Sequence, residues 1–497
     1  MKNKTDFSDF SRQLPIGIIV IYGNLLFRFL KVTWIFFFII FKDPSKLNGD
    51  RLFYISISLL LLLVFILIWA FLIFKNFLFR IHENHFELKQ GVLRKTNTSI
   101  DFDRIQNVNF KQNIIQQLLN IQQVEIETAG STKTEIIIRA LHLNDARLLK
   151  EKILEKQTFQ QGVIQSEKQK YFLKISGKEL LKVGLTENHL MSLLLLSSLV
   201  FGLYQQIKDL FKGYIIDIED FFKDGVNSVF NSLILFLFVI VATIAISIVT
   251  SIIRVFLFHF NLTILKNNKA FQITQGLFTV QSKLLKVNKI QSITISNNLL
   301  KRKLGISYVI FKQTVSGRVA KDKNKLVKIV GCKNNHLEKI KDFFFRINDE
   351  EFSKKLTSDI FLKRRLYFIN FLIVVFLNLF LLGNFYNIKL LFINVFLIPL
   401  LFFYVQKSYT KRHYSISDNF LFIAQGVIEV NHTFLPFFKV QNIKIKQTIF
   451  QKKRNVVDLI FQTASGKIKL PCLQKKDAMS IYNYTLYKIE SRQGEWI

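Results

Sequence analysis

The chain has 497 residues, of which 50% are hydrophobic, and 69 Lys and Arg against 35 Asp and Glu give a formal net charge of +34. The apolar fraction exceeds what the cores of an ordinary soluble protein require, which argues against a wholly soluble chain. Two Cys are too few for a fold held together by disulfides. The positive charge favours a polyanionic neighbour, and for a membrane protein the nearest is the anionic inner leaflet.

Six apolar runs are candidates to cross about 30 Å of hydrocarbon. They are Leu14–Phe41, Leu52–Phe74, Leu190–Ile207, Ser228–Ile253, Leu366–Leu382 and Leu390–Val405. Because the runs come in pairs, we predict three transmembrane hairpins over residues 14–74, 190–253 and 366–405. Arg28 and Lys31 interrupt the first run. We expect them to reach the interface or to pack within the bundle, and an ion or proton path is the alternative.

Lys and Arg are distributed unequally between the two sides of these spans. The connections 42–51, 208–227 and 383–389 together hold seven of them, whereas most of the others lie in the longer polar regions. By the positive-inside rule, the longer regions are cytoplasmic. We therefore predict a multi-pass protein of the cell inner (plasma) membrane with both termini in the cytoplasm.

The longer polar regions, 76–165, 255–350 and 407–493, repeat one pattern. Each has a Gly between two alternating segments, a Gln fifteen residues later, and an Asn or Gly fourteen residues after that Gln. The markers are Gly91, Gln106 and Asn120, then Gly276, Gln291 and Gly305, and then Gly426, Gln441 and Asn455. The first marker predicts a hairpin turn and the last predicts the left-handed end of a short helix. We expect each Gln to bond to neighbouring backbone, with ligand contact as the alternative.

Each region continues with a second β-hairpin and ends in an amphipathic helix. The expected helices are Asn144–Lys156, Asn335–Ile347 and Lys476–Ile489. About 80 residues in a bent antiparallel sheet closed by one helix are enough to bury a core. We therefore predict α-helical membrane hairpins that carry three cytoplasmic α+β domains, each a small β-barrel or sandwich.

The first copy resembles a known family. Its run Asp103-Arg104-Ile105-Gln106-Asn107-Val108, followed by Gln112 and by Thr128-Ala129-Gly130, resembles the bacterial pleckstrin-homology (PH)-like domain of YdbS- and YdbT-type membrane proteins. The layout of hairpin and domain, three times over, resembles the three-domain form along nearly the whole chain. The resemblance implies a PH-like fold in a non-enzymatic, membrane-bound module without catalytic residues, and it leaves the ligand open.

Two basic triplets are the only candidate contact residues. Lys301-Arg302-Lys303 and Lys452-Lys453-Arg454 replace Gln116-Gln117-Leu118 of the first copy. Such clusters attract a lipid headgroup or a protein partner, and a merely solvated basic face is the alternative. The sequence has no phosphate-binding loop, nucleophile elbow or HExxH spacing, so we predict no enzymatic activity, cofactor or metal. We expect Cys332 and Cys472 to be buried apolar residues.

These observations predict a membrane-anchored scaffold that displays three PH-like domains at the cytoplasmic face, in a role such as envelope maintenance. The domains are expected to bind anionic headgroups, one another or a membrane-protein partner, and no nucleic acid is expected. One alternative is a six-span transporter or export component, which requires ionisable residues to converge within the membrane. Another is an oligomeric assembly that is indifferent to lipid charge.

Overall fold

A computed structural model describes most of the chain. The described residues are 7–40, 49–128, 136–156, 171–187, 189, 198, 202, 233–267, 270–314, 326–345, 355–385 and 388–491. The chain divides into two compact units, one of residues 1–177, 187–266 and 272–284, and the other of residues 178–186, 267–271 and 285–497. The second of the three repeated regions therefore contributes to both units.

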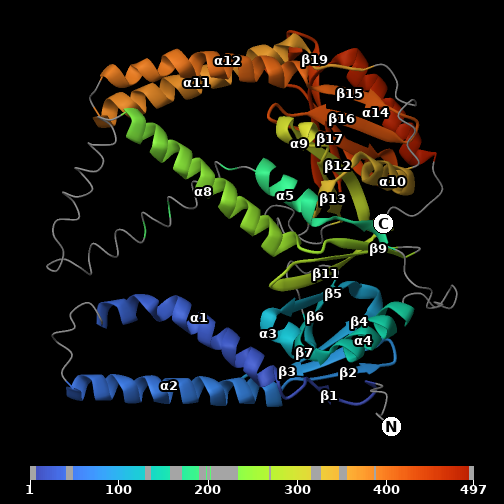
Figure 1. The fold of residues 1–497 in the computed structure, drawn as a ribbon. Helices are drawn as coiled ribbons and strands as arrows, with labels where there is room; N and C mark the ends of the chain where they lie inside the picture. The colour runs from blue at the N-terminus through green and yellow to red at the C-terminus, as the bar shows by residue number, and fades with distance from the viewer. Residues whose placement is uncertain are drawn as a thin grey trace. The chain divides into compact units, whose positions relative to one another are not determined.

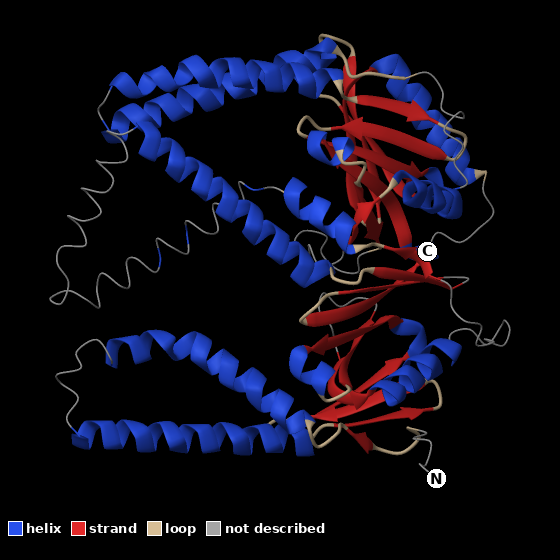
Figure 2. Ribbon diagram, viewed as in Figure 1, coloured by secondary structure: helices blue, strands red, loops and turns tan. Residues whose placement is uncertain are grey.

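Long apolar helices occur in each of the three regions for which a membrane hairpin is predicted (Figures 1 and 2). They are α1 (Gly17–Ile40), α2 (Gly49–Lys75), α8 (Leu233–His259), α11 (Ile360–Phe385) and α12 (Asn394–Thr410), which follows the 3-10 helix η6 (Ile388–Ile393). Among the described residues, four stretches are long and apolar enough to cross a membrane, namely Phe53–Lys75, Val241–His259, Ile360–Gly383 and Leu391–Thr410. The predicted run Leu190–Ile207 lies largely outside the described residues.

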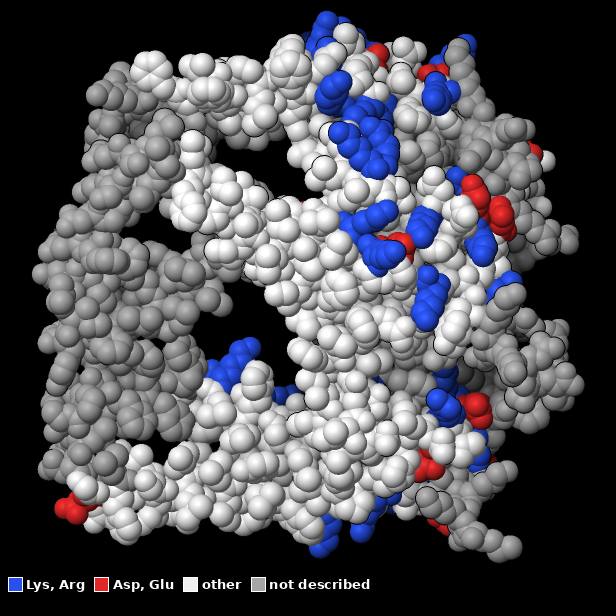
Figure 3. Space-filling model, in the orientation of Figure 1, with Lys and Arg blue, Asp and Glu red and all other residues white. Residues whose placement is uncertain are grey.

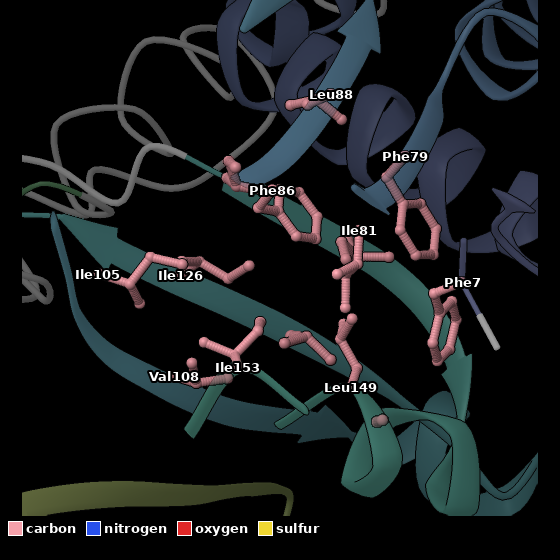
Figure 4. Close-up of a cluster of buried hydrophobic side chains, with 14 of the residues drawn as sticks. Phe7, Phe79, Ile81, Phe86, Leu88, Ile105, Val108, Ile126, Leu149 and Ile153 are labelled. Carbon is pink, nitrogen blue, oxygen red and sulfur yellow. The ribbon is translucent and has the colours of Figure 1, made fainter. Parts of the chain in front are cut away.

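The first repeat builds two layers of strands and a closing helix. Its elements are β2 (Leu78–His82), β3 (His85–Gln90), β4 (Thr96–Asp101), η2 (Phe102–Arg104), β5 (Ile105–Asn113), α3 (Ile114–Leu118), β6 (Ile121–Thr128), β7 (Ile136–His142) and α4 (Leu143–Lys156). Phe79 and Phe86 stack in its core with their ring centroids 6.0 Å apart. Leu149 and Ile153 of α4 pack into the same cluster of buried side chains (Figure 4). The alternating strands therefore bury one face each beneath the amphipathic helix.

The second and third repeats use the same order of elements. The second has β9 (Thr263–Asn267), β10 (Ala270–Gln275), β11 (Thr279–Lys286), η3 (Val287–Lys289), β12 (Ile290–Asn298), α9 (Leu299–Lys303), β13 (Ser307–Gln313), β14 (Leu326–Cys332) and α10 (Asn334–Phe345). The third has β15 (His413–Ile416), β16 (Phe420–Gln425), β17 (Glu429–Pro436), η7 (Phe437–Lys439), β18 (Val440–Lys446), α13 (Ile449–Lys452), β19 (Val456–Thr463), β20 (Gly466–Gln474) and α14 (Lys475–Glu490).

Strands of neighbouring repeats join in common sheets. One sheet has the order β7-β6-β5-β11-β10-β9-β8, with β8 at Tyr171–Lys174, and another has the order β14-β13-β12-β17-β16-β15. The remaining sheets are β1-β2-β3-β4, with β1 at Ser11–Arg12, and β18-β19-β20. Adjacent repeats are thus connected by β5 with β11 and by β12 with β17, a linkage that the sequence pattern did not indicate.

A short segment ahead of each hairpin pairs with the first strand after it. Arg12 of β1 pairs with Leu78, and Lys174 of β8 pairs with Thr263. Ahead of the third hairpin, Leu356 forms an antiparallel bridge with Tyr414. The helix α5 (Gly177–Thr186) follows β8. Each hairpin therefore leaves and re-enters its own domain at neighbouring strands.

The repeat markers occupy special backbone positions. Gly91, Gly276 and Gly426 have φ values of 112°, 116° and 115°, which side chains rarely adopt, and each lies in the turn between two strands. Asn120, Gly305 and Asn455 have φ values of 51°, 67° and 55° and follow the short helices, as a left-handed helix end requires. The Gln markers differ among themselves. Gln291 is buried and its Nε2 donates to Thr314 Oγ1 at 3.0 Å, Gln441 is exposed, and the side chain of Gln106 lies outside the described part.

Candidate functional site

Each short helix begins with a capping residue that fixes its orientation. Asn113 and Gln116 cap each other at α3, where the Gln116 amide donates to Asn113 Oδ1 at 2.8 Å and the Asn113 amide donates to Gln116 Oε1 at 2.9 Å. Thr448 and Gln451 form the same capping box at α13. At α9, the amide of Lys301 donates to the side chain of Asn298 at 2.7 Å. A cap of this kind sets the start of a helix within one residue, so equivalent side chains point the same way in all three repeats.

Lys301 is part of the packing and is not a surface residue. Its side chain is only 4% exposed, and its Nζ lies 3.2 Å from Glu429 Oε1 and 3.6 Å from the centroid of the Tyr308 ring. The capping pattern makes Gln116, Lys301 and Gln451 equivalent. The two basic triplets are therefore offset by one residue relative to each other, and only part of the second copy's triplet faces solvent.

The other residues of the triplets are exposed. Arg302 and Lys303 lie on the last turn of α9, and Lys452, Lys453 and Arg454 lie on α13 and just after it. Figure 3 shows that Lys and Arg gather over the parts of the molecule that contain the strands, whereas the long helices carry few of them. Of the six residues in the two triplets, these five are accessible for contact with an anion.

Sequence reasoning missed an apolar pair on the first turn of each short helix. The pairs are Ile114-Ile115, Leu299-Leu300 and Ile449-Phe450, and all six side chains are at least half exposed. Exposed apolar side chains thus recur at one place in all three copies, and exposed apolar patches are a common feature of surfaces that bind a membrane or a protein partner. The signal in the sequence is an apolar pair directly after the capping Asn or Thr, followed in the later copies by basic residues.

The hairpin turn after the marker Gly is bonded to the end of a membrane helix in the second repeat. The amide of Leu277 donates to Leu257 O at 3.0 Å, and the amide of Gly276 donates to Phe260 O at 2.9 Å, at the end of α8. Gln117 Nε2 of α3 donates to Leu277 O at 3.1 Å. The short helix α3 is therefore linked through this turn to the C-terminal end of α8.

Around α9 in the second unit, side chains connect the corresponding elements. Lys411, just after the end of α12, donates its Nζ to Val427 O in the third hairpin turn at 2.8 Å. Glu429 follows that turn and pairs with Lys301 of α9. The exposed side chains Leu299 and Leu300 are thus held near the domain end of α12.

Comparison with known proteins decides the family. A family model described as "Bacterial PH domain" matches the chain three times, over residues 16–157, 214–344 and 372–489. The chain belongs to the bacterial PH domain family. The first match begins one residue before α1 and the third begins inside α11, so the unit that repeats in this PH protein combines membrane-helix sequence with the domain that follows. The predicted three-copy PH organisation is confirmed.

A relative supports the membrane assignment of this PH protein. The chain is 22% identical over 334 residues to "UPF0699 transmembrane protein YdbT" of Bacillus subtilis (strain 168), a match that covers 64% of this chain and 66% of that protein. That relative is named a transmembrane protein, and four helical stretches of this chain have the length and hydropathy to span a bilayer. The chain is a membrane protein with three PH domains.

Proposed function

We propose that this protein is a non-enzymatic membrane scaffold whose three PH domains face the cytoplasm and dock onto the inner leaflet from which they hang. The short helices are the docking elements. The proposal is supported by the exposed apolar pair of each short helix, which is followed in α9 and α13 by exposed Lys and Arg. Apolar side chains that enter the interface, flanked by cations that meet anionic headgroups, are the features of a membrane-surface helix.

The expected energies are sufficient because the domains are already tethered. Each Lys or Arg near an anionic leaflet contributes about 1 kcal/mol, and burying a large apolar side chain contributes about 1.5–3 kcal/mol. Neither the three cations of α13 nor its apolar pair would hold a soluble domain on a membrane for long. Tethering through α11 and α12 makes the contact intramolecular, so weak contacts hold the third domain at the surface.

The lipid preference of α13 tests this proposal. The full-length protein with a fluorescent donor on Gln447→Cys, an exposed position just before α13, is reconstituted into nanodiscs that contain acceptor-labelled phosphatidylglycerol or acceptor-labelled phosphatidylcholine. We expect stronger energy transfer to phosphatidylglycerol. The triple substitution Lys452→Gln, Lys453→Gln and Arg454→Gln removes three charges, each worth about 1 kcal/mol, and should lower this preference more than tenfold.

A matched control removes the same charge from the same domain. Lys475, Lys476 and Lys488 lie on the closing helix α14, and replacing all three by Gln should leave the preference for phosphatidylglycerol unchanged. Equal preference in the wild type and the α13 variant would refute headgroup docking. If the two triple variants lost the preference for phosphatidylglycerol equally, the preference would depend on the net charge of the domain and not on α13.

Lys301→Gln should separate packing from lipid contact. Gln is the residue at the equivalent positions 116 and 451, but here it would remove the charge that pairs with the half-exposed Glu429 and lies over Tyr308. Because Glu429 remains accessible to water, we expect a loss of only about 1–2 kcal/mol in the free energy of unfolding. Lipid preference should not change. A loss of lipid preference without a loss of stability would show that Lys301 contacts lipid and contradict its role in packing.

A further inference from the structure

The chain uses one strand interface twice, in the same register. β5 pairs with β11 so that Asn113 lies opposite Thr279, and β12 pairs with β17 so that Asn298 lies opposite Glu429. Asn113 and Asn298 are both the caps of short helices, and Thr279 and Glu429 both stand three residues after the marker Gly. We call the strand after the marker Gly (β11, β17) the leading edge of its domain, and the strand before the short helix (β5, β12) the trailing edge. The trailing edge of one domain pairs with the leading edge of the next.

One leading edge and one trailing edge stay unpaired among the strands that the structure describes. β4, the counterpart of β11 and β17, ends the sheet β1-β2-β3-β4, and β18, the counterpart of β5 and β12, ends the sheet β18-β19-β20. Exposure reflects this difference, since Ile445 of β18 is 39% exposed whereas its counterpart Ile295 in β12 is 7% exposed. An open edge strand presents a row of backbone donors and acceptors that another strand can pair with.

We propose that β18 of one copy of this protein pairs with β4 of a second copy, in the register of the two internal junctions. That register places Thr448 opposite Arg94, Ile445 opposite Asn97, and Ile443 opposite Ser99. The two edges differ, so the contact is heterologous and copies add head to tail. Assemblies of this kind close into rings when the rotation between subunits permits, and otherwise extend as chains in the membrane.

The side chains of the two edges suit this pairing. A Lys on an edge strand often discourages association, and β18 carries two, Lys444 and Lys446. The equivalent of Lys446 occurs within an internal junction. This equivalent, Lys111 of the first repeat, lies inside a formed ladder opposite Gln281. β4 offers short polar side chains along its exposed positions, from Thr96 to Ser99. A Lys at this place in the ladder is therefore compatible with a formed junction.

Membrane anchoring favours the association. Copies that share one bilayer meet in a plane and with the same side facing the cytoplasm, so less rotational freedom is lost when two edges join. The internal junctions supply the geometry, because β12 and β17 already form a ladder of six residue pairs between domains that hang from successive hairpins. The first domain thus presents an open β4 and the third domain an open β18, which are the two strands that one further junction requires.

Disulfide trapping between two differently tagged full-length chains tests the proposal. One chain carries Ile445→Cys and the other carries Asn97→Cys, while the native Cys332 and Cys472 stay in place because both are buried. Opposite residues of an antiparallel ladder have Cα atoms about 4.5–5.5 Å apart, which is within reach of a disulfide. We expect a mixed-tag dimer on oxidation of membranes. A chain that carries both substitutions should give a ladder of dimers, trimers and larger species.

An off-register control uses Ile445→Cys with Asp101→Cys. Asp101 lies four residues further along β4, about 13 Å from the predicted position, and should trap poorly. Absence of the mixed-tag dimer would overturn the proposal, and so would equal trapping by Asp101→Cys. A monomer crosslinked only within itself would also overturn it, because the two edges would then meet inside one chain. Dimers formed by Ile445→Cys chains alone would indicate a symmetric contact instead.

Introduced charges provide a second test, in which both pairs of variants carry the same Ile445→Lys substitution and differ only at position 97. Ile445→Lys with Asn97→Lys places like charges opposite each other, and Ile445→Lys with Asn97→Asp places opposite charges there. Disulfide trapping is then measured through Ile443→Cys and Ser99→Cys. We expect trapping to be about fivefold lower with the two like charges than with the two opposite charges, since a fivefold change is the upper range for one cross-strand charge pair. Equal trapping in both pairs would contradict the register.

Discussion

Replacing Asp458 by Asn should destabilise the third PH domain by about 1.5–3 kcal/mol, the range for hydrogen bonds to a charged group, because its partners Lys469 and Arg365 remain accessible to water. The Asp458 side chain is 4% exposed, and its Oδ2 lies 2.6 Å from Lys469 Nζ and 3.9 Å from Arg365 Nη1. Its Oδ1 accepts from the amide of Cys472 at 2.8 Å and from Gln451 Nε2 at 2.9 Å. Asn cannot neutralise the cations, and Arg365 belongs to α11, so the link between membrane helix and domain should weaken too.

Reactivity of the buried thiols measures this loss in the full-length protein. Cys472 is buried beside Asp458, and Cys332 is buried in the second repeat. Asp458→Asn should speed modification of Cys472 by a soluble thiol reagent during thermal unfolding in detergent, with little change at Cys332. Asp477→Asn, on the first turn of α14, serves as the control. Equal protection of Cys472 in the wild type and in Asp458→Asn would contradict the expectation.

Acid should remove the same contribution. Burial alone would raise the pKa of Asp458, but the hydrogen bond from Lys469, the amide of Cys472 and the charge of Arg365 together hold it below the ordinary value of 3.8. A carboxyl whose pKa is lowered by folding stabilises the protein fully above its unfolded pKa, and this stabilisation is lost as the pH falls through the folded pKa. The stability difference between the wild type and Asp458→Asn should therefore be largest near pH 7 and should shrink below about pH 4.

Gly276→Ala should cost about 3 kcal/mol or more, because two effects combine. Gly276 has a φ of 116°, and a Cβ on it would lie 2.0 Å from Thr279 O, so the turn between β10 and β11 must deform. The same residue donates its amide to Phe260 O at the end of α8. We expect faster hydrogen exchange in β10 and β11 and a lower unfolding temperature of the full-length protein in detergent.

Gly177→Ala is the matched control for this prediction. A Cβ on Gly177 would meet no atom within 4 Å, and the residue begins α5, where Ala is a better helix former than Gly. Its stability should be unchanged or slightly higher. If the two Gly→Ala variants lost stability equally, the strain assigned to the turn would be wrong.

The sequence predicted the repeat well because its markers are conformational. Gly at a left-handed turn and Asn or Gly at a helix end are chosen by backbone sterics alone, so they remain visible when the packing residues change. Other positions change in concert. Lys301 lies over Tyr308 in the second repeat, whereas the equivalent Gln451 bonds to Asp458 in the third. A single sequence gives no sign that two such positions compensate, and this is why Lys301 was grouped with the surface cations.

The joining of repeats could not be predicted for a different reason. β12 and β18 are equivalent strands with similar alternation, yet β12 is covered by β17 and β18 is an edge. Hydrophobic periodicity reports which face of a strand is buried and says nothing about its edges, whose backbone groups are the same for every sequence. The exposed apolar pairs were overlooked because two adjacent apolar residues in a short helix look like ordinary core residues.

The strand pairs on either side of the hairpins determine whether the chain between them crosses the bilayer an even or an odd number of times. Arg12 and Leu78 are paired in one ladder, so they occupy the same compartment, and the chain between them must traverse the lipid an even number of times. α2 contains one candidate membrane span, Phe53–Lys75. We therefore expect α1 to be the second span of this hairpin, despite Arg28 and Lys31. Leu356 and Tyr414 bracket α11 and α12 in the same manner, which gives two traverses. Each of these strand pairs can therefore form only after both helices of its hairpin have inserted into the membrane.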